Sequence, residues 1–424
     1  MRVVITGMGV VAPNGIGLEA FEDSLRAGRS GVRFSQAMCD AKAQSQVAAI
    51  PPGADEAAEA RFTPEQLFAM NSGHRFAAIA AYEAFDDAGL TRSDLHGDTV
   101  DWDTGAIIGT GCGGVDTLGE RVVPMTDSGR VRRLGSAMVE QVMTSGAVAR
   151  VAGLLGLGNL TTANSSACST GSEAILMGLW HLRAGRSRRM LCGSVEGVSH
   201  YTWAGFDAMK VLAADSNQVP GRASRPLAHD ACGFVPGAGG GILVLETLDS
   251  ALERGARIYA EIRGGAANCG GHRGGGSMTA PNPTGVQRCI RAAIDDAGVD
   301  PAAIDAINAH ATGTFADPLE IKNWAQALEC KPDRLPQVTA TKSMIGHLLG
   351  AAGSVETIAS VLMLHGGFLH PSINCETLHP DIEDYAASIN RELTTRDDLD
   401  LIIKAGFGFG DVNSCLVLQK WHGN

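Results

Sequence analysis

The sequence lacks any long uninterrupted stretch of apolar residues. No run reaches the roughly 18–20 residues that a helix needs to cross a bilayer, and the N-terminal residues Met1 to Gly7 show no signal-peptide pattern. The ten cysteines form no Cys-x-x-Cys pair and no regular framework, which favours reduced thiols over disulfides or a zinc site. We therefore expect a soluble cytoplasmic protein that holds no metal ion and spans no membrane.

Positive charge is also scarce. The chain has 34 lysines and arginines against 46 aspartates and glutamates, which gives a formal net charge of −12. This balance argues against general binding to nucleic acid. Local basic patches remain compatible with an acidic protein partner.

Glycine, in contrast, is abundant, with 54 in 424 residues. The glycines cluster in short runs, as expected where many strands and helices meet in tight turns. Apolar spacing predicts strands over 2–12, 105–110, 257–262, 303–308, 399–404 and 414–419, and helices over 17–27, 70–87, 285–297, 318–328 and 347–364. A polar, alanine-rich loop is expected over 40–62. Strand–turn–helix units therefore recur in both halves, which predicts an α/β fold built from two similar halves.

A segment around Cys168 has an unusual composition. Small and hydroxyl residues from Thr162 to Ser172 surround this single cysteine, and apolar residues at helical spacing follow it. A thiol at a helix start is expected to have a lowered pKa, because the helix N-terminus carries partial positive charge. The segment therefore suits a nucleophile for acyl transfer, with the Cys168 backbone N–H helping to hold an oxyanion. The alternative is a buried cysteine that serves only as a small apolar residue.

Three other segments resemble this one in their small residues and their position at strand ends. Residues 308–314 contain His310, residues 341–347 contain Lys342 and His347, and residues 406–410 read Gly-Phe-Gly-Phe-Gly. Turns at strand ends are where α/β enzymes assemble their sites. The four segments are therefore expected to meet.

These four motifs, in this order, resemble the β-ketoacyl synthases, the elongating condensing enzymes of fatty-acid and type II polyketide synthesis. The resemblance runs from the opening strand to the Gly-Phe-Gly-Phe-Gly turn. It implies a thiolase-like fold with five layers, αβαβα, in which residues 1–250 carry the cysteine and residues 251–424 carry both histidines and the lysine. A thiolase would instead have a second cysteine in the C-terminal turn, and an initiating synthase would have asparagine in place of a second histidine.

The resemblance also implies roles for individual residues. Cys168 would accept an acyl group from the phosphopantetheine arm of acyl carrier protein, so that no cofactor is bound by the chain itself. His310 and His347 would donate hydrogen bonds to the malonyl thioester oxygen during decarboxylative condensation. The backbone N–H groups of Cys168 and Phe409 would form an oxyanion hole, and the Phe409 side chain would control access to the cysteine.

Three further residues are expected to support the site. By the resemblance, Lys342 sets the electrostatics around the histidines and pairs with the carboxylate of Glu320. Phe407, from the same turn as Phe409, would also lie beside the reacting groups.

Partners follow from the resemblance as well. Arg132 and Arg133, with Arg75 as a weaker candidate, would contact the acidic helix of acyl carrier protein. Members of the family are homodimers, or heterodimers with a chain-length-factor-like subunit that lacks the cysteine. The region 155–166 would supply the central strand of that interface.

The sequence departs from the family pattern at several turns. After Phe409 it reads Gly410-Asp411-Val412-Asn413, where Gly-Gly-Thr-Asn is usual, and the turn 237–241 lacks its usual glutamate. Residues 277–281 read Ser-Met-Thr-Ala-Pro, where His-Met-Thr is common before the last two. These changes favour a synthase of a specialised polyketide, polyene or pigment pathway. A housekeeping fatty-acid synthase and a chain-length-setting subunit without condensing activity are the alternatives.

Overall fold

The computed structural model describes residues 1–92, 99–271, 278–279 and 281–423. The glycine run 274–276, and residues 277 and 280 of the departure over 277–281, lie outside the described residues. Within the described chain, no helix combines the length and the apolarity that crossing a bilayer requires.

A mixed sheet runs through the molecule. Its strands follow the order β11-β10-β14-β15-β9-β1-β8-β7-β5-β6, and β2 pairs with β1. The strands of its N-terminal part are β1 (Val3–Ala12), β2 (Gly15–Ile16), β5 (Thr104–Gly109), β6 (Thr161–Thr162), β7 (Arg189–Glu196) and β8 (Gly239–Thr247). Those of its C-terminal part are β9 (Ala260–Cys269), β10 (Ala306–Asn308), β11 (Gln337–Thr339), β14 (Leu401–Gly408) and β15 (Val412–Lys420). The two parts are joined by a short antiparallel pairing in which Val4 and Ile5 of β1 face Glu261 and Ala260 of β9.

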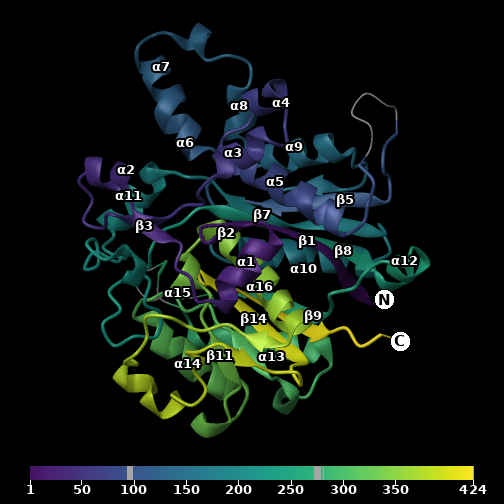
Figure 1. Cartoon of the computed structure of the whole chain (residues 1–424), viewed down its shortest axis with the longest axis vertical. Coiled ribbons are helices and arrows are strands. Elements are labelled where there is room, and N and C mark those ends of the chain that lie inside the picture. The colour runs from purple at the N-terminus through teal and green to yellow at the C-terminus, as the bar shows by residue number, and fades with distance from the viewer. Residues whose placement is uncertain (93–98, 272–277, 280, 424) are drawn as a thin grey trace.

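Helices divide the molecule into five layers (Figure 1). Helices α5 (Ser72–Asp87) and α9 (Gly146–Leu155) share an apolar core with the outer face of the N-terminal strands. Helices α13 (Pro283–Ala297) and α14 (Ala316–Ala327) cover the C-terminal strands in the same way. Between the two sets of strands lie α10 (Thr170–Arg183) and α16 (Ala352–Gly366), whose apolar side chains pack against both. The expected α/β fold in five layers is confirmed.

The central layer requires a helix that is buried on all sides. Every residue of α16 from Ala352 to Leu364 is buried. Most of them are apolar, and Thr357 and Ser360 satisfy their hydroxyl groups by donating to carbonyls of the preceding turn. The predicted helix over 347–364 begins too early. A 3-10 turn over Leu349–Ala351 precedes α16, and His347 lies in the loop before that turn.

Glycines in β8 allow helix α16 of the central layer to pack closely against this strand. A Cβ atom on Gly241 would lie 2.9 Å from the side chain of Ile358 and 3.0 Å from the backbone nitrogen of Val355 in α16. The predicted turn over 237–241 is therefore wrong in part, because residues 239–241 are the first residues of β8. Close packing against α16 explains this glycine run better than a turn does.

Three further predictions differ from the structure. The expected loop over 40–62 contains β4 (Val47–Ala49), which pairs with β3 (Val32–Phe34), and helix α3 (Ala54–Glu59). The strand expected over 257–262 extends to Cys269, and the strand expected to end at Lys404 extends to Gly408, because both continue to pair with β15. The Gly-Phe-Gly segment is thus largely strand.

The remaining elements are short and lie around these layers. They are α1 (Leu18–Arg26), α2 (Gln36–Asp40), α4 (Pro64–Phe68), α6 (Val115–Thr117), α7 (Val123–Asp127), α8 (Met138–Val142), α11 (His200–Ala208), α12 (Leu248–Glu253), α15 (Lys342–Ile345), β12 (Phe368–Leu369) and β13 (Thr394–Thr395). Helices α6 and α7 project from the body at the top of Figure 1. Strand β6 ends the sheet on the N-terminal side, so one of its edges is not paired within this sheet.

Candidate active site

Cys168 lies in a tight turn between β6 and α10, as predicted. The residue before it, Ala167, has a φ of 47°, a left-handed conformation that costs a non-glycine residue roughly 1–3 kcal/mol. The Thr170 hydroxyl holds the turn, because it donates to the Ala167 carbonyl at 2.7 Å and accepts from the Ser166 N–H at 2.8 Å. Ser169 donates to the carbonyls of Gly406 and Val412, both at 3.0 Å. The turn is therefore fixed to β14 and β15.

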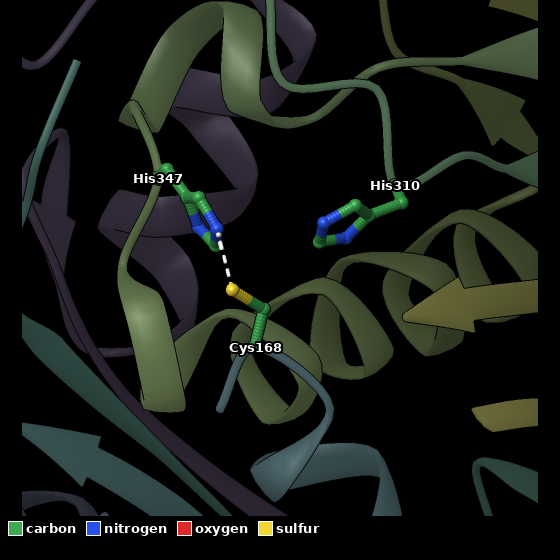
Figure 2. A group of neighbouring side chains, drawn as sticks. All are labelled: Cys168, His310 and His347. Atoms are coloured by element: carbon green, nitrogen blue, oxygen red, sulfur yellow. Dashed lines mark hydrogen bonds between the residues drawn. The ribbon is translucent and has the colours of Figure 1, made fainter. Parts of the chain in front are cut away.

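Two histidines meet the cysteine in the interior. The Cys168 sulfur lies 3.0 Å from Nε2 of His347, and the ring of His310 lies 5.4 Å from that of His347 at nearly a right angle. Figure 2 shows both imidazoles directed toward the space above the sulfur. Both imidazoles are almost completely enclosed, since the exposed fractions of His310 and His347 are 8% and 3%, and Cys168 is half-buried beside the cavity. The predicted convergence of these residues is confirmed in space.

Hydrogen bonds to the Nδ1 atoms decide which ring nitrogen carries the proton. The Leu349 N–H donates to Nδ1 of His347 at 3.2 Å, and the Lys342 ammonium lies 3.3 Å from Nδ1 of His310. An Nδ1 atom that accepts a hydrogen bond leaves the proton of the neutral ring on Nε2. Burial, with the charge of Lys342, holds the pKa of both histidines well below its usual range. Each imidazole is therefore a neutral Nε2–H donor at pH 7.

The partner predicted for Lys342 is wrong. Its ammonium pairs with Oε1 of Glu356, in α16, and donates to the His310 carbonyl at 2.5 Å. Glu320 instead accepts the N–H groups of His310 and Ala311, both at 2.7 Å. Glu320 thus positions the loop that carries His310 and does not touch the lysine. Burial raises its pKa to about 7.

The predicted low pKa of Cys168 is also wrong. Burial raises the pKa of this thiol to about 11, although the charge of Lys342 and the backbone N–H of Phe409 act in the opposite direction. The helix end was expected to dominate, but desolvation of a thiolate outweighs a partial charge at one helix terminus. The structure therefore supports Cys168 as a nucleophile by its position and contacts rather than by a lowered resting pKa.

Three buried charged residues were missed by the sequence reasoning. Glu356 pairs with Lys342 and also lies 3.0 Å from the ammonium of Lys404. Glu196, at the end of β7, accepts the N–H groups of Gly111, Cys112 and Gly350 at 2.9–3.0 Å. The signal for all three was a lone charge inside an apolar strand or helix, as in Leu401-Ile402-Ile403-Lys404. A buried charge of this kind requires a partner.

A cavity of about 540 Å³ opens beside Cys168. Aromatic side chains line it, with ring separations of 5.4 Å between Phe206 and Phe234 and 6.0 Å between Phe206 and Phe409. The Phe409 ring thus lines the route to the sulfur, while its backbone N–H is directed at the Cys168 thiol. Phe407 packs against the rings of His310 and Trp324. Both phenylalanines therefore lie where the sequence predicts.

Asp411, the residue that departs from the usual pattern, connects two segments at the cavity. Its carboxylate accepts the Asn282 N–H at 3.1 Å, and its backbone carbonyl accepts the Gly270 N–H at 2.8 Å. The neighbouring Gly410 N–H donates to the Met278 carbonyl at 2.9 Å. The turn after Phe409 is therefore tied to the ends of the segment 270–282.

The basic residues expected to meet a protein partner lie away from this cavity. Arg132 and Arg133 are exposed in a 3-10 turn over Val131–Arg133, beyond α7. Arg75 is paired with Asp55 at 2.6 Å. The structure thus leaves the two arginines accessible, and their binding role stays a prediction.

The cysteine and the two histidines also have the composition of a metal site, since their ligand atoms all lie within 4.8 Å of one another. The surroundings do not suit a cation. Ligation through Nε2 of His347 would move its proton to Nδ1, where the Leu349 N–H already donates. The buried Lys342 ammonium beside His310 would repel the ion.

Comparison with known proteins agrees with this geometry. The family model for the β-ketoacyl synthase N-terminal domain matches residues 1–251, and the model for the C-terminal domain of the same family matches residues 259–376. The chain is 32% identical to 3-oxoacyl-[acyl-carrier-protein] synthase 1 of Haemophilus influenzae over all of both chains. It is 35% identical to the actinorhodin polyketide putative β-ketoacyl synthase 1 of Streptomyces coelicolor, over 99% of this chain and 88% of the relative.

A solved structure is similar throughout. The ishigamide ketosynthase/chain length factor matches with a TM-score of 0.86 and 31% identity, over 99% of both chains. The layers described above are therefore the thiolase-like arrangement of ketosynthases.

Proposed function

Because this chain belongs to the β-ketoacyl synthase family and is an acyltransferase, we propose that it condenses acyl groups on acyl carrier protein in a specialised type II polyketide or polyene pathway. The observation that carries the proposal is the contact of the Cys168 sulfur with Nε2 of His347, beside a second neutral Nε2–H donor on His310. A thiol and two fixed N–H donors are what acyl transfer and enolate stabilisation require.

The first step is transfer of the acyl group. The sulfur of Cys168 bonds to the thioester carbonyl carbon, the bond to the phosphopantetheine sulfur breaks, and the carrier leaves as a thiol with the proton of Cys168. The backbone N–H groups of Cys168 and Phe409 stabilise the oxyanion that forms between these events. The carrier arm is thus a substrate handle, and the chain holds no cofactor of its own.

The second step is decarboxylative condensation. The malonyl group on a second carrier loses its carboxylate as carbon dioxide, and the electron pair of the broken bond forms an enolate. The Nε2–H groups of His310 and His347 donate to the enolate oxygen as its charge develops. The enolate carbon then attacks the Cys168 thioester, the sulfur leaves as the thiolate, and the product is longer by two carbons.

The pathway rests on different observations. Similarity to a fatty-acid type synthase and to polyketide synthases is nearly equal, so identity does not decide. Asp411 and Val412 stand where Gly-Thr is usual, and Asp411 lines the cavity, which favours a specialised acyl substrate. Housekeeping fatty-acid elongation is the alternative. Loss of bulk membrane fatty acids on deletion of the gene would support housekeeping elongation instead of the specialised pathway.

Partners are part of the proposal. Arg132 and Arg133 would bind the acidic carrier protein through their exposed guanidinium groups. The free edge of β6 in the 155–166 region would pair with a second subunit, either another copy or a subunit like the chain length factor named with the ishigamide ketosynthase. A chain-length-setting subunit without condensing activity is disfavoured for this chain, because Cys168 is present and contacts His347.

The test is intact-mass spectrometry with carrier proteins that bear different acyl groups, alone and with a candidate partner subunit. The wild-type chain is expected to gain an acyl adduct that Cys168→Ala lacks, with a preference for unsaturated or polyketide-type groups. A preference for ordinary saturated acyl chains would contradict the proposed specialised pathway. If no adduct forms either with the chain alone or with the partner subunit, the proposed synthase activity is contradicted.

A further inference from the structure

Lys404 is a second buried lysine beneath the reacting groups. It lies in β14, its side chain is 0% exposed, and its Nζ lies 3.0 Å from Oε2 of Glu356 and 3.2 Å from the Ser172 hydroxyl. Ser172 belongs to the first turn of α10. The ammonium is thus held between the helix that follows the nucleophile and the central helix α16.

Glu356 is shared between two cations. Its Oε1 pairs with Lys342 and its Oε2 with Lys404, and all three side chains are at most 1% exposed. Two ammonium groups and one carboxylate leave one positive charge in excess. Burying such a cluster is costly, and an apolar residue at position 404 would still leave Glu356 paired with Lys342. The extra cation is therefore not explained by the pairing of Glu356.

The excess charge acts on both histidines. Lys404 contributes with Lys342 to the lowered pKa of His310 and of His347. The other titratable groups that face Lys404 or the two rings are Glu356, Cys168, Cys415 and Glu320, which accepts the His310 N–H. Burial raises the pKa of both thiols, so they are neutral at pH 7, and raises the pKa of Glu320 to about 7. Burial lowers the pKa of Lys404, and the charge of Glu356 opposes this shift. An unbalanced buried cation opposes protonation of a nearby imidazole and favours a nearby anion.

We propose that Lys404 is a positioning residue of the condensation step: through Glu356 it fixes the Lys342 ammonium against His310, and it supplies the excess positive charge that favours neutral imidazoles and an enolate. The role assigned to the enolate rests on the proposed condensing function. The effect on the histidines requires no substrate, so the two are tested separately.

The first experiment titrates ¹³C-labelled histidines by NMR in the full chain without substrate. Lys404→Met keeps the length of the side chain and removes the charge, and Lys322→Met removes a lysine from an ion pair on the surface of α14. We expect His310 and His347 to begin protonating at higher pH in Lys404→Met, by on the order of one unit, and at the wild-type pH in Lys322→Met. Identical titrations in wild type and Lys404→Met overturn the proposal.

The second experiment measures condensation with saturating acylated enzyme and malonyl carrier protein. In Lys404→Met we expect kcat to fall on the order of tenfold, with KM for the malonyl carrier changed little and the acid limb of the pH profile moved to higher pH. An unchanged kcat and pH profile in a wild type that condenses normally overturns the role in condensation. A wild type that fails to condense contradicts the proposed function, while the titrations still decide the role of Lys404.

A third variant, Lys404→Arg, keeps the proposal testable if Lys404→Met does not fold. Lys404→Arg keeps the charge, so its histidine titration must match that of the wild type. A shifted titration in folded Lys404→Arg shows that packing rather than charge controls the rings and overturns the proposal.

Discussion

The two parts of the sheet contribute to the site by different physical means. The N-terminal part supplies the nucleophile and fixes it by backbone geometry, through the left-handed Ala167 and the hydroxyl of Thr170. The C-terminal part supplies the imidazoles: the buried pair of Lys342 and Glu356 holds His310, while the backbone N–H of Leu349 orients His347. Groups held by the backbone are visible in a local stretch of sequence. Groups held by charge depend on partners that only the folded chain brings together.

The largest effect is expected from removing the nucleophile, which the N-terminal part of the sheet positions by backbone geometry. Cys168→Ala removes the sulfur, so acyl transfer is expected to fall on the order of 10³-fold or more. The free energy of unfolding should change little, because the turn is held by its neighbours. Acyl-adduct formation measured by mass spectrometry checks this, with Cys330→Ser, three residues after the end of α14, as the control. An adduct of normal yield in Cys168→Ala would show that another residue is the nucleophile.

The next largest effect is expected from His310→Ala, which separates the acyl-transfer step from the condensation step. His310→Ala leaves the contact of Cys168 with His347 in place, so acylation should persist while condensation falls by about 10²–10³-fold. Rates of acyl-adduct formation and of carbon dioxide release give the two steps independently. His181→Ala, at the far end of α10, is the control. Equal losses in both steps would mean that His310 serves acyl transfer as well.

A smaller effect concerns the carboxylate that positions His310. Glu320→Gln provides one acceptor oxygen for two N–H groups, so it should destabilise the fold by about 1–3 kcal/mol at low pH and lower condensation about tenfold. Glu19→Gln on the exposed face of α1 is the control, measured by denaturant unfolding and by initial rates.

The same variant has a defined pH dependence. The pKa of Glu320 is raised to about 7 by burial, so between its unfolded value and about 7 the folded state binds the extra proton. The contribution of Glu320 to stability is therefore present at low pH and lost as the pH rises through that window. In Glu320→Gln the unfolding free energy should no longer fall across this window, and the fall that it removes is at most about 3 kcal/mol. A constant difference in unfolding free energy across the window would contradict the shift.

The smallest effect is expected at the turn after Phe409. Asp411→Ala removes the acceptor for the Asn282 N–H, so the cavity should be less well ordered and KM for the acyl carrier should rise a few-fold, within about tenfold. Asp411→Asn keeps an acceptor oxygen and tolerates the φ of 61°, and it serves as the matched control. Equal KM values in both variants would show that the carboxylate does not order the turn.

Cys168, His310, His347 and Phe409 are predictable from the sequence because each belongs to a local motif of small residues. The resemblance pairs Lys342 with Glu320, whereas the fold places α15, which carries Lys342, beside α16, so that Lys342 pairs with Glu356. The pairing of Lys404 is not predictable from the sequence for the same reason, because its partner Glu356 is remote in the chain. The pKa of Cys168 was predicted in the wrong direction, because the degree of burial is a property of all five layers and not of the segment around the thiol.

The central claim is that Cys168 carries the acyl group and that His310 is needed only when the malonyl group reacts. The most direct measurement loads the enzyme with one acyl group, removes the carrier, adds malonyl carrier protein and follows the mass of the enzyme. We predict that the adduct disappears from the wild type as a β-ketoacyl carrier protein longer by two carbons forms, and that it persists in His310→Ala. An adduct that persists in the wild type, or disappears from both without product, would contradict the account.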